Sequence, residues 1–364
     1  METQHLISKK IDNNTHFVFH KISKKFLIFD TLYIDLFNQF YSLSKKKFTH
    51  YILNNFSNSD PKSIYSELKE LSQIQDFKTV KKEYNYTIPQ KLNIFNFKLG
   101  DNYFSINYDD IKVVNTIIGQ LFHLKDKINI TSINYYVFKS KGRYFLNNDH
   151  QNIGSWSNNE IHYLTGKLLS LIMCDFHKVE EKKWAAFLHA STVSKDNNAI
   201  VIVGESGSGK STSCAILSKN GFKLISDDTT PISREGKVGN FPNSISIKEP
   251  SFQKINDSFL KENLSNIINV SKGKVKYLNP HGLNKFNPET INCSTIVRIK
   301  YNLEKQNSLK KVKLKDLLPL IVNESFFPTN LKSIKGFMNW FINCKCYTLN
   351  YNNDKSLINL FKNL

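Results

Sequence analysis

The sequence is poor in several residues that mark particular protein classes. Its 364 residues include 14 glycines and 9 prolines, which excludes collagen-like and Pro/Gly-rich low-complexity chains. The five cysteines are odd in number and widely scattered, so they predict no disulfide framework and favour a reducing compartment. There is no apolar signal-peptide core and no apolar run near the ~20 residues that cross a bilayer. We therefore expect a soluble cytoplasmic protein with no membrane partner.

Arginine is also scarce, although the chain is strongly basic. The 50 Lys+Arg and 31 Asp+Glu residues give a net charge of +19, but only three of the 50 are arginine, the residue that most often contacts bases. The lysines are spread along the chain, so we interpret most of the charge as compositional drift and do not favour nucleic acid as a partner. Hydrophobic residues make up 40%, enough for cores in the two or three domains that the length suggests.

Residues 1–80 combine aromatic-rich apolar stretches with three helical patterns. HFVFHKISKKFLIFD has a polar turn between two apolar stretches, which predicts a β-hairpin. Helices are predicted over TLYIDLFNQFYSL, KKFTHYILNNF and PKSIYSELKELSQI, with Thr31 and Asp60 capping the first and the third. This order resembles the small α+β PqqD-like fold, which recognises leader peptides of ribosomally made, modified peptides. A winged-helix domain would give the same pattern.

The PqqD-like resemblance implies a peptide that adds as a strand to the edge of the hairpin. The residues that would line its site are Phe17, Val18, Phe19, Phe26 and Ile28. The alternative is that these side chains form a hydrophobic core.

Residues 81–91 are polar and predict a linker. Residues 92–183 alternate between strand and helix patterns, which predicts the α/β N-terminal part of a larger domain. Amphipathic helices are predicted over IKVVNTIIGQLFHL and EIHYLTGKLLSLIMCDFH. No residue of this region is expected to carry chemistry.

Residues 184–364 contain the most specific motif. AIVIV predicts a buried strand, GESGSGKS matches G-x-x-x-x-G-K-[ST], and TSCAILSKNG predicts a helix. In this setting backbone N–H groups bind phosphates, Lys210 neutralises the β- and γ-phosphates, and Ser211 ligates Mg²⁺. The predicted ATP- and Mg²⁺-binding residues are Gly204, Ser206, Gly207, Ser208, Gly209, Lys210, Ser211 and Thr212.

Two adjacent acidic residues follow after one helix and one strand, in FKLISDDTTPI. In a β-loop-α-β unit the end of the second strand lies beside the phosphate loop, so Asp227 and Asp228 are expected there. Carboxylates in that position hold Mg²⁺ and accept a proton from an attacking hydroxyl. ABC transporter ATPases are excluded because no LSGGQ-type signature follows.

Three segments resemble the HPr kinase/phosphorylase family and the wider PEP-carboxykinase-like P-loop fold. They are HAS, which contains His189, the loop GESGSGKS, and GFKLISDD. The resemblance implies an α/β kinase domain in which Lys210 takes part in catalysis and Asp227 is the general base. It implies that Asp228 helps to hold the metal with Ser211, and that His189 lies beside the acidic pair.

Two basic residues further along extend the resemblance. Lys248, in FPNSISIKEP, and Arg298, in STIVRIKYN, would neutralise the transferring phosphate. Thr212 stands where the bifunctional enzymes carry an acidic residue, and the loop that grips HPr is not recognisable. We therefore predict neither phosphorylase activity nor HPr as the substrate.

Together these patterns predict an ATP-dependent kinase for a serine or threonine hydroxyl of a ribosomally made precursor peptide. The N-terminal element would bind the leader of that peptide. One alternative is a kinase for a small hydroxyl-bearing metabolite such as free serine, and another is an ATP-gated nucleic-acid-binding regulator. The kinase resemblance also implies a homo-oligomer.

Overall fold

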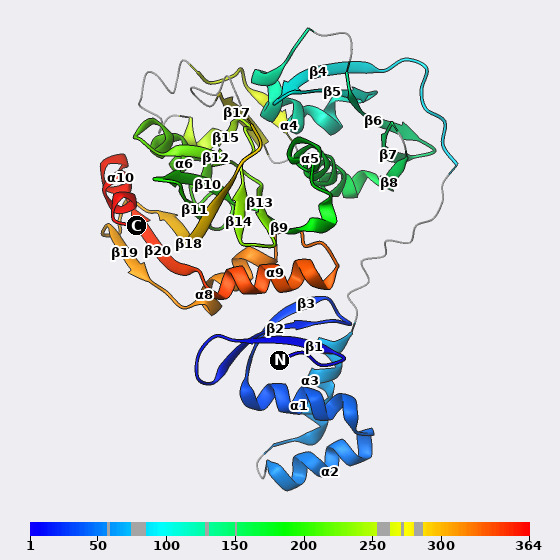
Figure 1. The fold of residues 1–364 in the computed structure, drawn as a ribbon, viewed down its shortest axis with the longest axis vertical. Coiled ribbons are helices and arrows are strands. Elements are labelled where there is room, and N and C mark those ends of the chain that lie inside the picture. Colours follow the sequence, from blue (N-terminus) through cyan, green and yellow to red (C-terminus); the bar gives the residue numbers. More distant parts are fainter. Residues whose placement is uncertain are drawn as a thin grey trace.

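The computed structural model describes residues 1–56, 59–73, 85–127, 131–149, 151–252, 263–270, 273–279 and 287–364. Within these ranges the chain is a mixed α/β protein with four β-sheets. A small N-terminal module, residues 1–73, lies below a larger body that contains the rest of the described chain (Figure 1). Residues 81–84 of the predicted linker lie outside the described residues, and 85–91 contain no helix or strand.

The N-terminal module is a three-stranded antiparallel sheet followed by three helices. Its elements are β1 (Leu6–Lys10), β2 (Thr15–His20), β3 (Lys25–Asp30), α1 (Thr31–Ser42), α2 (Lys45–Asn55) and α3 (Pro61–Ser72). The predicted hairpin and three helices are confirmed, and β1 adds a third strand that the sequence pattern did not indicate. The cap of α1 is Asp30 rather than Thr31, because the Asp30 carboxylate accepts a hydrogen bond from the backbone N–H of Tyr33 at 2.7 Å.

The larger body begins with a five-stranded sheet in the order β4-β5-β6-β7-β8. Its elements are β4 (Asn93–Leu99), β5 (Asn102–Tyr108), α4 (Ile111–Leu121), η1 (Phe122–Leu124), β6 (Ile133–Ser140), β7 (Arg143–Asn148), β8 (Asn152–Trp156), η2 (Asn158–Glu160) and α5 (Ile161–His177). The predicted alternation of strands and helices is confirmed. Helices α4 and α5 share one apolar core with this sheet.

A nine-stranded sheet forms the centre of the body. Its strands are β9 (Trp184–Leu188), β10 (Ser191–Lys195), β11 (Asn198–Val203), β12 (Lys223–Ser226), β13 (Thr230–Ser233), β14 (Lys237–Gly239), β18 (Thr290–Tyr301), β19 (Ser308–Lys311) and β20 (Lys345–Tyr351). Their order is β12-β10-β11-β18-β14-β13-β9, with β20 paired to β18 and β19. Strand β10 separates β11 from β12 and is antiparallel to both, so β11 and β12 still end at the same edge.

The remaining elements are helices and a small sheet in which β15, β17 and β16 pair in that order. They are η3 (Glu181–Lys183), α6 (Lys210–Lys219), β15 (Ile245–Lys248), η4 (Glu249–Ser251), β16 (Ile268–Val270), β17 (Gly273–Leu278), α8 (Leu314–Val322), α9 (Leu331–Ile342) and α10 (Asp354–Lys362). Helices α6 and α10 belong to one apolar cluster, and α8 and α9 belong to another. Among the helices that the structure describes, none is long and apolar enough to cross a membrane.

Two connections of the central sheet bend at the same corner. Residues 189–190 join β9 to β10, and residues 227–229 join β12 to β13. Because β9 pairs with β13 and β10 pairs with β12, both connections pass the same point of the sheet. The corner therefore brings His189 beside Asp228, although 39 residues separate them in the chain.

The sheet of the N-terminal module is covered on both faces. Val18 packs in a cluster with α1, α2 and α3. Phe17 and Phe19 face the larger body, where the ring of Phe17 lies 6.1 Å from that of Phe337 and 5.4 Å from that of Phe341. These three residues of the central strand β2 are core side chains and leave no surface for a peptide, which corrects their prediction as peptide contacts.

Candidate active site

The phosphate-loop motif connects β11 to α6, which is the strand–loop–helix context that the sequence predicts. Gly209 has φ = +97°, and a Cβ there would lie 2.9 Å from the hydroxyl of Tyr351. A Cβ on Gly204 would lie 2.5 Å from Ser208 Oγ. Glycine is therefore required at both ends of the loop, because the turn is left-handed at one end and tightly packed at the other.

The loop lysine is buried and lies against its own loop. Lys210 is 8% exposed, and its ammonium donates hydrogen bonds to the carbonyl of Gly204 at 2.6 Å and to that of Glu205 at 3.4 Å. Burial lowers its pKa, and nearby carboxylates, first of all Glu324, oppose that shift. A cation anchored in this way, at the start of a helix, is placed to neutralise an anion that meets the loop.

The two predicted basic residues also reach the loop. Lys248 Nζ, at the end of β15, donates a hydrogen bond to Ser206 Oγ at 3.0 Å. Arg298, on β18, forms an ion pair with the carboxylate of Glu205. Three cations from three elements thus converge on the phosphate loop, which we call the phosphate end of the site.

The two adjacent aspartates lie in opposite environments. Asp227 has no exposed surface, and its carboxylate accepts hydrogen bonds from Ser191 Oγ at 2.6 Å and from Ser246 N at 2.9 Å. Burial and the charge of Asp228 raise the pKa of Asp227 to about 6. The side chain of Asp228 is 41% exposed, and its backbone has φ = +65°, a conformation that costs about 1 kcal/mol for a non-glycine residue.

The roles predicted for the two carboxylates stay predictions, but their surroundings differ. The Asp227 carboxylate also interacts with the hydroxyl of Ser211, as expected for the pair that holds Mg²⁺ in P-loop enzymes. Hydroxyl and carboxylate oxygens suit Mg²⁺, so Ser211 and Asp227 fit this ion. No group of three or more His, Cys, Asp or Glu side chains within the described ranges has metal-binding geometry. Asp228 is the accessible carboxylate of the pair.

Two further side chains contact Asp228, and a third contacts it through His189. The Nδ1 atom of His189 lies 3.3 Å from the Asp228 carboxylate, and Nε2 lies 3.4 Å from the carboxylate of Glu324. Gln120, at the end of α4, donates a hydrogen bond to Asp228 Oδ2 at 3.4 Å. Gln120 is 1% exposed, and its Oε1 atom has no hydrogen-bond partner among the described residues. We call Asp228, His189, Gln120 and Glu324 the acceptor end of the site.

Gln120 and Glu324 were not predicted. Gln120 lies on a helix that was expected to carry no chemistry, and the nearby Gly119 allows close approach because a Cβ there would overlap the ring of Tyr277. Glu324 follows α8 in NES, which matches no motif. No sequence signal marks either residue, because each reaches the site only through the packing of its helix.

The predicted peptide residues Phe26 and Ile28 lie on the neighbouring strand, where Phe26 pairs with Phe19 and Ile28 pairs with Phe17. They belong to β3, whose outer edge has no partner strand in the described sheet, beside a groove of about 460 Å³. Leu318, Pro319 and Val322 of α8 form the opposite wall. The ring of Phe26 also packs at 4.8 Å from that of Phe327, which follows α8.

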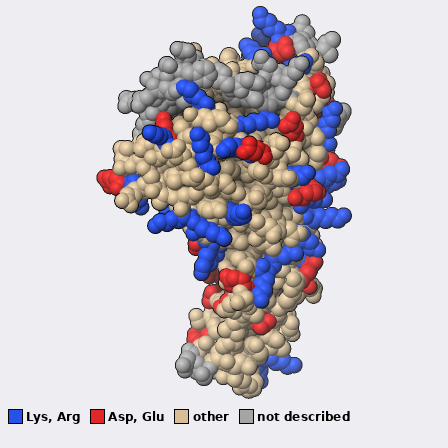
Figure 2. All heavy atoms as spheres, turned by 60° about the vertical axis from the view of Figure 1, so that its left-hand side comes forward, with Lys and Arg blue, Asp and Glu red and all other residues tan. Residues whose placement is uncertain are grey.

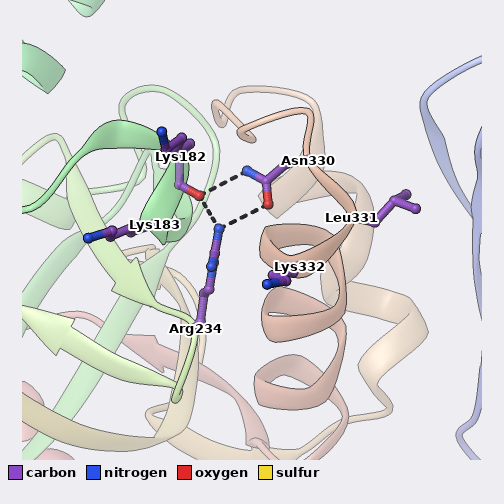
Figure 3. Close-up of a pocket in the computed structure, with 6 residues that line it drawn as sticks. All are labelled: Lys182, Lys183, Arg234, Asn330, Leu331 and Lys332. Carbon is purple, nitrogen blue, oxygen red and sulfur yellow. Dashed lines mark hydrogen bonds between the residues drawn. The ribbon is translucent and has the colours of Figure 1, made fainter.

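A second pocket is lined by residues that hold the start of α9 and by none of the phosphate loop. Its volume is about 390 Å³, and it is lined by Lys182, Lys183, Arg234, Asn330, Leu331 and Lys332 (Figure 3). The Arg234 guanidinium donates hydrogen bonds to the carbonyl of Lys182 and to Asn330 Oδ1, the latter at 3.0 Å. Arg234 therefore fastens the start of α9, the helix on which the N-terminal sheet packs.

The excess positive charge is not concentrated in one patch of the face that Figure 2 shows. Lysine and arginine side chains are spread over that face, with acidic side chains among them. This distribution agrees with the interpretation of the +19 net charge as compositional drift.

Comparisons with known proteins find likenesses among solved structures alone. No family model matches the chain, and no curated protein matches its sequence. Among solved structures, the HPr(Ser) kinase/phosphatase from Coxiella burnetii aligns over 49% of this chain and 94% of that chain, with 11% sequence identity and a TM-score of 0.24. A TM-score this low does not establish a common fold.

Proposed function

We propose that the protein is an ATP-dependent kinase that phosphorylates a hydroxyl group, with a serine or threonine of a peptide as the acceptor. The observation that carries this proposal is the pairing of a P-loop lysine with an accessible carboxylate at one corner of the sheet. Lys210 supports phosphate binding, and Asp228 supports proton removal. Phosphoryl transfer requires mainly positioning and charge neutralisation, and both are provided by groups of this chain.

In the proposed reaction the acceptor oxygen forms a bond to the γ-phosphorus of ATP, and the bond to the bridging oxygen breaks to release ADP. The hydroxyl proton passes to the Asp228 carboxylate. Lys210, Lys248 and Arg298 neutralise the phosphate oxygens. Mg²⁺ held near Ser211, when bound, supplies additional neutralisation of phosphate charge.

We further propose that the acceptor is part of an extended peptide that adds to the free edge of β3. An unpaired strand edge offers backbone donors and acceptors for strand addition. The adjoining groove provides apolar contacts from Ile28 and Val322. A peptide held at β3 raises the concentration of its own hydroxyl at the site, up to the millimolar range for short connections.

The test of kinase activity is incubation of the full-length protein with Mg-ATP and the short peptides encoded by neighbouring genes. The expected product is a peptide whose mass has increased by one phosphate, with fragmentation mapping the group to serine or threonine. If the protein binds ATP but phosphorylates none of these peptides nor free serine, the kinase proposal is wrong.

The peptide groove is tested separately by Ile28→Lys and Val322→Lys, with Leu53→Lys on the exposed surface of α2 as the matched control. The groove variants should lower peptide phosphorylation about tenfold, because a buried lysine opposes apolar contact, and leave ATP consumption without peptide unchanged. Deletion of the N-terminal module is a poor test, because it would expose Phe337 and Phe341. Equal peptide phosphorylation by all three variants would contradict docking in the groove.

A further inference from the structure

The segment after α8 is held rigidly at the acceptor end. Phe326 exchanges two backbone hydrogen bonds with Phe187 of β9, at 2.8 and 2.9 Å. The hydroxyl of Ser325 accepts a hydrogen bond from the backbone N–H of His189 at 3.1 Å. Glu324 therefore extends from a backbone that is fixed to the same connection that carries His189.

His189 is contacted at both ring nitrogens. Its Nδ1 atom lies 3.1 Å from the carbonyl oxygen of Asp228 and 3.3 Å from the carboxylate of the same residue. Its Nε2 atom lies 3.4 Å from the carboxylate of Glu324. Contacts at two opposite edges of the ring fix its orientation, whereas a single contact would leave it free to rotate about that contact.

We propose that Glu324 is a positioning residue of the acceptor end, which orients Asp228 through His189. This inference rests on the proposed kinase function. Asp228 has a left-handed backbone, and His189 contacts both its carbonyl and its carboxylate, so a fixed imidazole supports that conformation. Glu324 completes the support from the other side of the ring.

The exposure of Glu324 separates this role from that of a stabilising ion pair of the fold. The Glu324 side chain is 53% exposed, and exposed ion pairs contribute little to stability. Removal of the Glu324 charge should therefore change phosphoryl transfer and leave thermal unfolding unchanged.

The test uses the full-length protein with Mg-ATP, and it measures phosphate release to water together with binding of a fluorescent ATP analogue. Glu324→Gln should lower kcat about tenfold, because a misplaced catalytic group costs rate. A change in the KM for ATP would report the separate loss of the Glu324 charge near Lys210. Glu324→Asp should recover part of the rate. Glu235→Gln, on an exposed turn between β13 and β14, is the matched control and should behave as the wild type.

A double-mutant cycle with His189→Gln distinguishes action through His189 from independent action. If Glu324 acts through the imidazole, Glu324→Gln should lower kcat by less than about twofold in the His189→Gln background. NMR of the histidine ring nitrogens gives a second readout, in which Glu324→Gln should shift the His189 signal and Glu235→Gln should not. The His189→Gln spectrum assigns that signal.

The outcomes separate the two proposals. Three outcomes would each overturn the positioning role and leave the kinase proposal standing. They are additive losses of kcat in the double-mutant cycle, an unchanged kcat in Glu324→Gln, and a His189 NMR signal that does not shift. A wild-type protein that binds the ATP analogue and transfers phosphate to neither water nor a hydroxyl would overturn the kinase proposal. The positioning role would then fall with it, whatever the NMR spectrum shows.

Discussion

The two ends of the site are built in different ways. The phosphate end comes from one continuous segment between β11 and α6, to which Lys248 and Arg298 add charge from neighbouring strands. The acceptor end collects side chains from four separate stretches: the end of α4, the β9–β10 connection, the β12–β13 connection and the segment after α8. A contiguous loop specifies its geometry locally, whereas an assembled cluster depends on the packing of the whole body.

The largest expected effect is at the phosphate end. Lys210→Met removes the buried ammonium that faces the loop carbonyls, so phosphate charge would be left without its nearest cation. We expect ATP turnover to fall by about a hundredfold to a thousandfold, measured as ADP formed by full-length protein. The matched control is Lys219→Met, in the last turn of the same helix. Turnover within a few-fold of the wild type would contradict the role of the loop.

The next effect is at the acceptor end and separates the two aspartates. Asp228→Asn should lower phosphoryl transfer by about a hundredfold while binding of a fluorescent ATP analogue is unchanged, because the amide accepts no proton. Asp227→Asn should instead raise the Mg²⁺ concentration needed for half-maximal binding of that analogue. If the two results were exchanged, Asp227 would be the base, as the family resemblance implies.

The phosphate end could be predicted from sequence and the acceptor end only in part. The loop and the acidic pair are local patterns, in which glycines and spacing are set by direct neighbours. The prediction of His189 rests on the resemblance of the segment HAS to a family. The structure places His189 beside Asp228 because the β9–β10 and β12–β13 connections bend at the same corner of the sheet. Glu324 has no local pattern, because its place depends on where α8 ends against the sheet.

The N-terminal module gives a similar lesson. The apolar pattern of HFVFHKISKKFLIFD correctly predicts two strands, but it does not distinguish a core face from a binding face. Phe17 and Phe19 pack on α9, a helix more than 300 residues later in the chain. Only Phe26 and Ile28 remain at an open groove, because β3 is the edge strand.

A smaller effect is expected from Gln120. Gln120→Ala removes the donor to Asp228 Oδ2 without changing the accessible carboxylate itself. We expect kcat for phosphoryl transfer to fall about tenfold with the KM for ATP unchanged, since only the orientation of Asp228 is affected. Gln151→Ala, on the exposed surface before β8, is the matched control. A tenfold rise in the KM for ATP with kcat unchanged would instead place Gln120 at the phosphate end.

The smallest effect at neutral pH is expected from His123, in the turn η1 that directly follows α4 and Gln120. Its Nδ1 atom hydrogen-bonds with Ser244 Oγ at 2.8 Å, and burial lowers its pKa from 6.5 to about 4. The unfolded chain therefore binds a proton that the folded chain does not bind between these pH values. The stability that depends on neutral His123 is complete above pH 6.5 and is lost as the pH falls toward 4.

A shift of this size corresponds to about 3 kcal/mol at most. His123→Gln keeps a hydrogen-bonding side chain that does not titrate, so urea unfolding should show the same stability as the wild type at neutral pH within about 1 kcal/mol. On acidification the variant should lose less stability than the wild type. His20 and His177, which are also buried with lowered pKa values, contribute equally to both proteins and cancel in the difference. Parallel stability curves would mean that the packing around His123 admits the charged imidazole, contrary to the lowered pKa.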